Sequence, residues 1–300
     1  MTRTAQRTSR AATVAVVSGA SRGAGKGIAL ALGEAGATVY CLGRTRRDGP
    51  RPIDGAPGSI DDTADEVTAR GGRGIAVATD CTDEAQVAAA FVQVERDHGG
   101  LDVLANAVWG GADAFRSADE WMASMGRPFW ERAGQMWSLT MDAGPRAYLL
   151  ASAQAARLMT PRKRGLIVGL TDFVFGDPET PKKGHMPGML FPVVAHDCIN
   201  RLMYCLSEEV KKAGIAVVTL MPGFMRTERV ERAMTTDKLK KMMRYDLSES
   251  VLYVGRAVAA LAGDPKVKGK TGRIHYVADL AEEYGFTDAD GTRHPRFDPF

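Results

Sequence analysis

Short apolar runs rich in Val, Ile and Ala alternate along the chain with longer amphipathic segments. Near-continuous apolar runs are typical of strands buried on both faces of a parallel sheet, and the amphipathic segments are typical of helices that cover those faces. The alternation predicts an α/β protein with a doubly wound, seven-stranded parallel sheet. The expected strands are residues 14–17, 39–42, 74–79, 103–107, 166–170, 216–220 and 274–277.

The same pattern predicts how the chain is divided. We expect a single domain over residues 13–278, because open α/β sheets of this size often fold as one unit. In this interpretation residues 1–12 form a disordered basic tail, and residues 279–300 form a C-terminal extension that folds over the body. Apolar residues at near-helical spacing, among them Leu280 and Tyr284, would anchor that extension.

Three stretches interrupt the alternation, and each follows the carboxyl end of an expected strand. They are residues 109–131, 172–190 and 224–250. In an open parallel sheet the carboxyl edge holds the ligand, and functional residues concentrate in the loops there. We therefore expect these insertions to form the substrate site. Residues 45–58, dense in Gly, Pro and Arg, are expected to form a further long loop.

Gly19, Gly23 and Gly25 lie between the first strand and the helix that follows it. A dinucleotide-binding turn must bend sharply, bring bare backbone to the pyrophosphate and pack its helix closely on the sheet, and each task excludes a Cβ. The arrangement is typical of a Rossmann-type fold. Residues 19–23 also fit the Gly-x-Ser-x-Gly elbow of hydrolases, but no earlier strand is predicted that could supply an oxyanion loop.

The end of the second expected strand indicates which dinucleotide would bind. No carboxylate stands there to grip a ribose diol, whereas Arg22 and Arg44 could meet a 2′-phosphate beside Thr45. The sequence therefore favours NADP(H) over NAD(H). We expect Arg46 and Arg47 only to solvate the long loop.

Composition narrows the range of partners. The net charge of +3 is mild, and basic residues do not interleave with aromatic ones, so a small anionic ligand fits better than nucleic acid. The four cysteines show neither a CxxC pair nor metal-ligand spacing, which predicts reduced thiols, a cytoplasmic protein and no metal site. Arg22 and Lys26 interrupt the first apolar run well before the roughly 20 residues needed to cross a bilayer, so no membrane span is expected.

Further motifs at the strand ends extend the argument. Asp80 closes the third expected strand, Asn106 closes the fourth, and Pro222-Gly223 precedes Thr227 after the sixth. With residues 18–25, these motifs resemble the short-chain dehydrogenase/reductase family over about residues 13–278. The resemblance implies backbone contact with the dinucleotide along the first turn, adenine contact after the third strand, and support of the nicotinamide end by the later motifs. Together with Arg44 and Thr45 from the 2′-phosphate argument, and with His196 as an alternative ribose contact in place of the family's Lys, the expected cofactor-binding residues are Gly19, Ser21, Arg22, Gly23, Ala24, Gly25, Arg44, Thr45, Asp80, Cys81, Asn106, His196, Pro222, Gly223 and Thr227.

The chain departs from the family at its catalytic residues. The family uses a Tyr and a Lys four residues apart on one helix, and these places fall on Pro192 and His196. A shift of one residue does not restore the pair. Asp172 takes the place of the family's Ser, and the family's Asn place falls at or near Gly144. The chain is thus expected to be an atypical member, with its active-site helix beginning at Pro192 because proline suits a first turn.

His196 and Asp172 are the leading candidates to replace the missing phenol, since a histidine oriented by a carboxylate can transfer a proton. Alternatively, His196 contacts ribose in place of the Lys, or both residues only cap structure. Lys182, Lys183 and His185 in the 172–190 insertion are further candidates.

Aromatic and apolar residues expected around the cleft favour a small cyclic or aromatic carbonyl or imine substrate. They are Trp109, Phe173, Phe191, Pro192, Phe224 and Met225. Three functions stay open: an NADP(H)-dependent reductase or dehydrogenase with a non-standard proton donor, a non-redox cyclase, isomerase or dehydratase that retains the nucleotide, and a catalytically silent NADP-binding partner protein. The resemblance also implies a homodimer or homotetramer through helices within residues 133–159 and 192–213.

Overall fold

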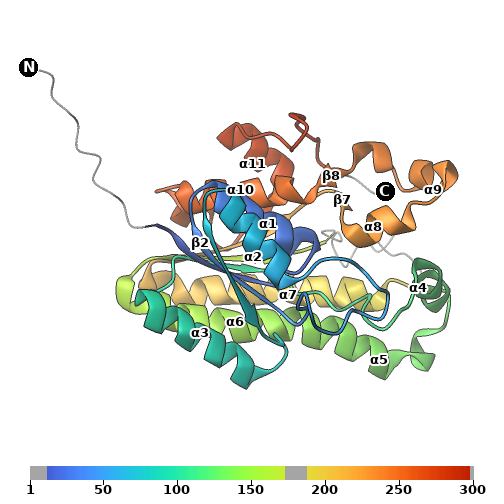
Figure 1. Ribbon diagram of the computed structural model, residues 1–300, viewed down its shortest axis with the longest axis horizontal. Helices are drawn as coiled ribbons and strands as arrows, with labels where there is room; N and C mark the ends of the chain where they lie inside the picture. Colours follow the sequence, from blue (N-terminus) through green and yellow to red (C-terminus); the bar gives the residue numbers. More distant parts are fainter. Residues whose placement is uncertain (1–11, 173–187, 298–300) are drawn as a thin grey trace, which may run out of the picture.

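A parallel sheet of seven strands lies between two layers of helices in the computed structural model, which describes residues 12–172 and 188–297 (Figure 1). The strand order is β3-β2-β1-β4-β5-β6-β9. The predicted doubly wound, single-domain α/β fold is confirmed. The strands are β1 (Val14–Ser18), β2 (Thr38–Gly43), β3 (Arg73–Ala78), β4 (Val103–Asn106), β5 (Gly165–Leu170), β6 (Ile215–Met221) and β9 (Ile274–Tyr276).

The expected strands and the observed ones differ at their ends by no more than one residue. The agreement follows from burial: every residue of β1, β2, β4 and β6 is buried, so each strand reads as an uninterrupted apolar run. A small second sheet was not predicted. It pairs β7 (Met225–Arg226) with β8 (Glu249–Ser250), and strands of two residues are too short to show a periodic pattern.

Helices cover both faces of the sheet, and each layer seals a hydrophobic core (Figure 1). One layer holds α1 (Gly23–Glu34), α2 (Ile60–Ala69), α10 (Val251–Gly263) and α11 (Val277–Tyr284), and the other holds α3 (Glu84–His98), α6 (Ala147–Met159) and α7 (Leu190–Val210). Helices α1 and α10 approach closely because both lack a side chain at the contact. A Cβ on Gly27 would lie 1.8 Å from the Val251 carbonyl oxygen, and one on Gly255 would lie 2.3 Å from that of Gly27.

The insertions carry shorter helices. These are α4 (Ala118–Met125), α5 (Ala133–Trp137), α8 (Glu228–Ala233) and α9 (Asp237–Met242), together with the 3-10 turns Phe129–Glu131, Thr160–Arg162, Lys211–Ala213, Tyr245–Leu247 and Val267–Lys270. A π-helical segment, η2 (Ser138–Arg146), joins α5 to α6. Its backbone leaves helical geometry at Ala143 and Gly144, just before Pro145, so the helix is kinked beside the carboxyl edge of the sheet.

The C-terminal extension packs against the body. Helix α11 ends at Gly285, which has a left-handed φ of +77°, and the chain then turns back. The Asp288 carboxylate is buried, accepts a hydrogen bond of 2.7 Å from the backbone N–H of Ser250, and lies 2.9 Å from Nε2 of His294. Arg256 on α10 donates to the carbonyl oxygens of Thr287 and Asp288 at 2.6 and 2.8 Å. The extension is thereby fastened to β8 and α10.

One expectation needs qualification. Helix α7 begins at Leu190, two residues before the expected Pro192, because Met189 already accepts the backbone N–H of Val193 at 3.0 Å. Pro192 still lies in the first turn, where its missing N–H costs nothing.

Some expected features lie outside the described residues. They are the basic tail through residue 11, and Phe173, Lys182, Lys183 and His185 of the 172–190 insertion. Among the described helices, none has the length and apolar composition to cross a membrane.

Candidate functional site

The turn between β1 and α1 is built from glycines for steric reasons. Gly19 has φ +76°, and a Cβ there would lie 2.8 Å from the Ala107 carbonyl oxygen. A Cβ on Gly25 would lie 2.2 Å from the Gly19 carbonyl oxygen, and Gly23 has φ +57°. The bare backbone of this turn faces the carboxyl edge of the sheet, where a phosphate can approach the N-terminus of α1. Gly19 and Gly25 therefore have no room for a side chain, and Gly19 and Gly23 have left-handed backbone geometry that favours glycine.

Asn106 lies beneath that turn and is fully buried. Its side-chain oxygen accepts a hydrogen bond of 3.3 Å from the Ser18 hydroxyl, and its amide donates to the Ser152 hydroxyl at 3.2 Å. Asn106 therefore ties the ends of β1 and β4 to α6.

Arg22, which was expected to meet a 2′-phosphate, is engaged by the 45–58 loop. It donates to the carbonyl oxygens of Pro57 and Gly58 at 3.0 and 3.1 Å, and to the hydroxyl of the buried Thr45 at 3.2 Å. Burial, and then the nearby Arg229, lower the pKa of Arg22. Its guanidinium thus holds the 45–58 loop against α1.

Arg44 remains the accessible arginine at the end of β2, with a side chain 60% exposed. It forms an ion pair with Asp113 of the 109–131 insertion. An anionic group on a ligand would have to compete with that carboxylate for the guanidinium.

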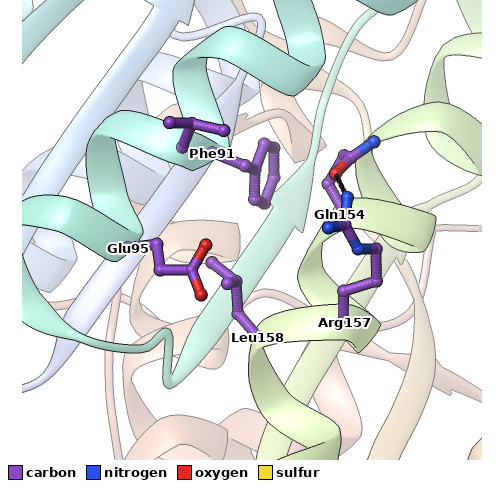
Figure 2. Close-up of a pocket in the computed structure, with 6 residues that line it drawn as sticks. Phe91, Glu95, Gln154, Arg157 and Leu158 are labelled. Atoms are coloured by element: carbon purple, nitrogen blue, oxygen red, sulfur yellow. Dashed lines mark hydrogen bonds between the residues drawn. The ribbon is translucent and has the colours of Figure 1, made fainter.

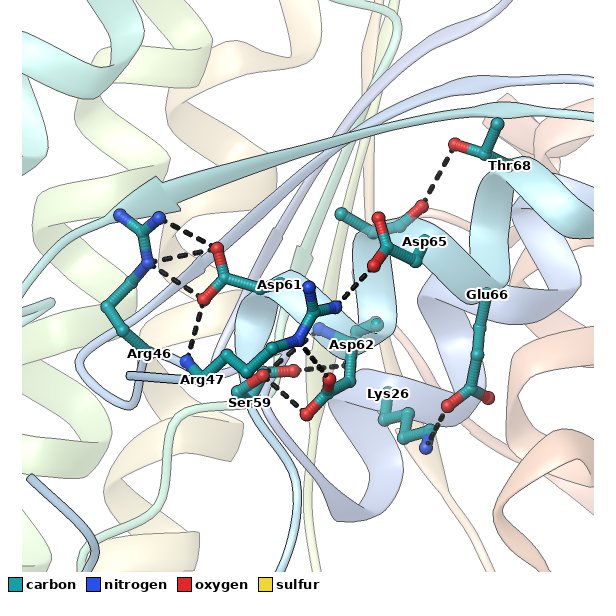
Figure 3. A network of polar contacts seen from close by, with 11 residues as sticks. Lys26, Arg46, Arg47, Ser59, Asp61, Asp62, Asp65, Glu66 and Thr68 are labelled. Atoms are coloured by element: carbon teal, nitrogen blue, oxygen red, sulfur yellow. Dashed lines mark hydrogen bonds and ion pairs between the residues drawn. The ribbon is translucent and has the colours of Figure 1, made fainter. Parts of the chain in front are cut away.

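Arg46 and Arg47 were expected only to solvate the loop, and this was wrong. Figure 3 shows both side chains paired with the acidic first turns of α2. Arg46 forms an ion pair of 2.7 Å with Asp61, and Arg47 pairs with Asp62 at 2.8 Å and with Asp65. These arginines therefore anchor the loop to α2, although exposed pairs of this kind stabilise a fold only slightly.

Asp80 and Cys81 follow β3 as expected. The Asp80 carboxylate accepts hydrogen bonds of 2.9 and 2.7 Å from the backbone N–H and the hydroxyl of Thr82, so it caps its own turn. Burial raises the pKa of the Cys81 thiol to about 12, and a protonated buried thiol is chemically inert.

The segment after β6 also lies at the glycine turn between β1 and α1. It carries Pro222, Gly223 and Thr227. Thr227 caps α8 by accepting the N–H of Val230 at 3.3 Å, and its methyl carbon would lie 3.6 Å from a Cβ on Gly23. The segment after β6 thus lies directly against the glycine turn.

Glu249 is a buried acid that the sequence argument missed. It is 2% exposed, and a Cβ on Gly223 would lie 2.7 Å from its Oε2. Burial raises the pKa of Glu249 to about 8, opposed by a hydrogen bond from the Gly223 N–H and by Arg226, while Asp288 raises it further. Its Oε1 has no hydrogen-bond partner among the described residues. Glu249 is therefore protonated at neutral pH.

His196 lies one helical turn beyond Pro192, and its Nδ1 is 2.9 Å from the Pro192 carbonyl oxygen. A carbonyl only accepts, so Nδ1 carries the hydrogen and Nε2 carries the lone pair. The imidazole stacks on Trp109, with ring centroids 4.4 Å apart. Although some of its surface is exposed, the surrounding protein atoms lower the pKa of His196 to about 4. The ring is therefore neutral at neutral pH, and its lone pair lies on Nε2.

Trp109 is held in place by residues without side chains. A Cβ on Gly111 would lie 2.6 Å from the indole nitrogen, and a Cβ on Gly144 would lie 3.4 Å from the benzo edge of the same ring. Gly144 is the position at or near which the family's Asn was expected, and there the indole lies against bare backbone. The structure thus brings Trp109, Gly144 and His196 together.

Asp172 lies two residues after the end of β5 and is exposed. Because His196 Nδ1 is engaged by Pro192, a pairing between Asp172 and His196 would have to form through Nε2.

The other expected lining residues have contacts within the fold. Phe191 is only 6% exposed and belongs to a small core with Phe115 and Met136. Phe224 stacks on Phe297 of the C-terminal extension, with centroids 6.0 Å apart. Met225 packs on the main core. Phe191 therefore faces the interior, and within residues 12–172 and 188–297 the aromatic ring stacked on His196 is that of Trp109.

A small cavity lies elsewhere, between α3 and α6 (Figure 2). Its volume of about 20 Å³ is enough for one water molecule. It lies toward the end of α6 that leads into β5, opposite the carboxyl edge, so it takes no part in the site. It is lined by Phe91, Val92, Glu95, Gln154, Arg157 and Leu158.

Comparison with known proteins agrees with this geometry. The family model described as enoyl-(acyl carrier protein) reductase matches residues 19–279. Dehydrogenase/reductase SDR family member 1 of Mus musculus is 36% identical over 286 residues, which cover 93% of this chain and 83% of that protein. The chain belongs to the short-chain dehydrogenase/reductase family. The predicted family is confirmed, and its members are oxidoreductases.

Solved structures of the family share the fold. A short chain dehydrogenase of Mycobacterium thermoresistibile aligns with a TM-score of 0.71 at 22% identity, covering 96% of this chain and 92% of that one. A 7α-hydroxysteroid dehydrogenase solved with NADH and 7-oxo glycochenodeoxycholic acid aligns with a TM-score of 0.66 at 18% identity, covering 94% and 95%.

Proposed function

We propose that this short-chain dehydrogenase/reductase is an NADP(H)-dependent reductase or dehydrogenase that transfers its proton without the family's Tyr and Lys. Its substrate would be a small cyclic or aromatic carbonyl or imine compound, or the corresponding alcohol or amine. The observation that supports dinucleotide binding most directly is the glycine turn at α1, where Gly19 and Gly25 have no room for a Cβ.

The residues present fit such a cofactor. The backbone from Gly19 to Gly25 would hold the pyrophosphate at the N-terminus of α1. Arg44 would meet a 2′-phosphate in competition with Asp113, since Arg44 is exposed and β2 itself carries no acidic residue. Pro222, Gly223 and Thr227 would support the nicotinamide end. When bound, the nicotinamide supplies or accepts a hydride.

The proton that accompanies hydride transfer would have to be exchanged with a side chain of the protein or carried by the substrate. His196 is neutral with its lone pair on Nε2, so it suits removal of a proton from an alcohol better than donation to an alkoxide. In the reductive direction the same neutral ring favours a substrate that brings its own proton, such as an iminium ion. Trp109 covers one face of His196 and shields it from water.

The neutral imidazole also supports a second candidate. A base with a free lone pair can remove a proton next to a carbonyl, which begins an isomerisation, dehydration or cyclisation without net redox change. In that case the dinucleotide would be retained for structure.

Dinucleotide titration tests the cofactor assignment. We expect NADPH to bind more tightly than NADH by calorimetry, and equal or better NADH affinity would contradict the role of Arg44. Binding without turnover of any carbonyl, imine or alcohol tested would favour a silent binding protein.

Restoration of the family's pair tests the proton assignment. The double variant Pro192→Tyr, His196→Lys should gain activity on ordinary ketones, which the natural protein should reduce slowly. The single variant His196→Lys is its matched control. Rapid reduction of ordinary ketones by the natural protein, unchanged in an Asp172→Ala, His196→Ala variant, would show that the acid lies elsewhere.

We also propose that the protein is a homodimer or homotetramer, paired through α6 and α7. Large apolar side chains on these helices are well exposed: Leu149, Val194 and Tyr204 at 44, 46 and 47%. Exposed apolar side chains on two neighbouring helices are typical of a subunit contact. A single monomeric mass by light scattering would contradict this.

A further inference from the structure

The N-terminus of α1 already holds an anionic group, supplied by the chain itself. The Oε2 atom of Glu228 accepts a hydrogen bond of 2.7 Å from the backbone N–H of Gly23, 205 residues away in sequence. Gly23 is the first residue of α1, so this N–H has no partner within the helix. A carboxylate in this position takes the interaction that a phosphate takes at a helix N-terminus.

A network of ion pairs holds Glu228 there. Its neighbour Arg229 donates to Asp54 of the 45–58 loop at 2.7 Å and to Asp113 of the 109–131 insertion at 2.9 Å. Asp113 also pairs with Arg44. Three segments, following β2, β4 and β7, are therefore joined across the glycine turn by charged side chains.

These pairs are partly shielded from water. The side chains of Arg229, Asp113 and Asp54 are 26, 22 and 11% exposed. Burial disfavours the charge on Asp54, but the hydrogen bonds from Arg229 and from the Ala56 N–H leave its pKa below the usual range. Ion pairs with restricted solvent access resist screening better than pairs in open solvent.

We propose that Glu228 is a built-in competitor for the dinucleotide phosphate, so that dinucleotide binding displaces Glu228 and releases α8 from the glycine turn. This inference rests on the proposed function. A phosphate and a carboxylate cannot share the Gly23 N–H, and two anions held close together at that helix end repel each other. Glu228 directly follows Thr227, whose methyl carbon would lie 3.6 Å from a Cβ on Gly23, so departure of Glu228 loosens the start of the 224–250 insertion. Dinucleotide binding is thereby linked to opening of the substrate site.

Another role for Glu228 would be to stabilise α8, since it lies in the first turn of that helix. Glu231 lies in the same turn but accepts a hydrogen bond from the Tyr245 hydroxyl instead of touching Gly23. The pair Glu228→Gln and Glu231→Gln therefore separates the two roles, because each variant removes one carboxylate from the same helical turn.

The experiment measures NADPH affinity of the natural protein and both variants by calorimetry, and amide hydrogen exchange of residues 228–233 with and without NADPH. We expect Glu228→Gln to bind NADPH roughly tenfold more tightly, about the effect of one charge-assisted hydrogen bond. Exchange of residues 228–233 should rise on NADPH addition in the natural protein and should already be high in Glu228→Gln. Glu231→Gln should match the natural protein in affinity.

Three results would contradict the inference. Equal NADPH affinity in the natural protein and Glu228→Gln rejects it while leaving the proposed function intact. An equal gain in both variants assigns the effect to general charge and not to the Gly23 contact. Absence of NADPH binding in all three proteins rejects the proposed function and this inference with it.

Discussion

The buried acid Glu249 gives a quantitative prediction about stability. The replacement Glu249→Gln keeps an oxygen that can accept the Gly223 N–H and removes the ionisable group. Burial is the main cause that raises the pKa of Glu249 in the folded protein from its ordinary value of 4.5 to about 8. Asp288 adds to the shift, and Arg226 opposes it.

Proton linkage determines whether the free energy of unfolding rises or falls with pH. Between pH 4.5 and about 8 the unfolded chain has lost this proton while the folded protein retains it. The free energy of unfolding therefore falls as pH rises through that window, by about 1.4 kcal/mol per pH unit. The contribution of protonated Glu249 to the free energy of unfolding is complete below pH 4.5 and is lost near pH 8. At neutral pH the free energy of unfolding is lower than at pH 4.5 by at most about 3 kcal/mol because of this group.

Urea unfolding, followed by tryptophan fluorescence at a series of pH values, measures the effect. Glu249→Gln should equal the natural protein near pH 4.5 and become progressively more stable toward pH 8. Glu209→Gln, which removes an exposed carboxylate from α7, is the matched control. If the natural protein and Glu249→Gln show parallel pH dependence over this window, Glu249 is not held protonated and the burial argument fails.

Three further predictions concern individual side chains. Arg44→Asp should shift the preference from NADPH toward NADH in calorimetry, since a carboxylate there suits a ribose diol; an unchanged preference would place 2′-phosphate recognition elsewhere. With the pKa of His196 near 4, alcohol oxidation should stay flat across neutral pH and fall only as pH approaches 4; a break at the usual histidine value of about 6.5 would contradict the neutral ring. Asp288→Ala should cost about 3 kcal/mol of unfolding free energy, because donors such as the Ser250 N–H lose a buried acceptor; a loss below about 1 kcal/mol would show that the C-terminal extension is held by other contacts.

The sheet and the cofactor turn could be predicted because local sequence determines both. Strand β6 is buried along its whole length, so its apolar run identifies it without knowledge of its neighbours. The need for glycine at position 25 arises from the nearby Gly19 backbone, and at position 19 from the backbone of Ala107 just after β4, but both glycines stand together in one short turn between β1 and α1. Such constraints leave a short pattern in the sequence.

The charged contacts of the site could not be predicted in this way. The hydrogen bond from Gly23 to Glu228 spans 205 residues and depends on where the short helix α8 comes to lie. Glu249 looks like any surface acid in the sequence, and only the return of the C-terminal extension, with Asp288, buries it. The placement of His196 was predicted from the family's spacing, but its neutral state depends on the packing of Trp109.

Hydride transfer is the central claim, and isotope transfer tests it most directly. The protein is incubated with NADPH carrying deuterium at the transferable position of the nicotinamide ring and with a panel of cyclic and aromatic ketones and iminium compounds. Products are analysed by mass spectrometry. We expect one deuterium in the alcohol or amine product, with an equal amount of NADPH consumed, and a preference for iminium over ketone substrates. Conversion of a substrate without deuterium uptake or NADPH consumption would contradict the oxidoreductase assignment and favour a non-redox reaction on the same scaffold.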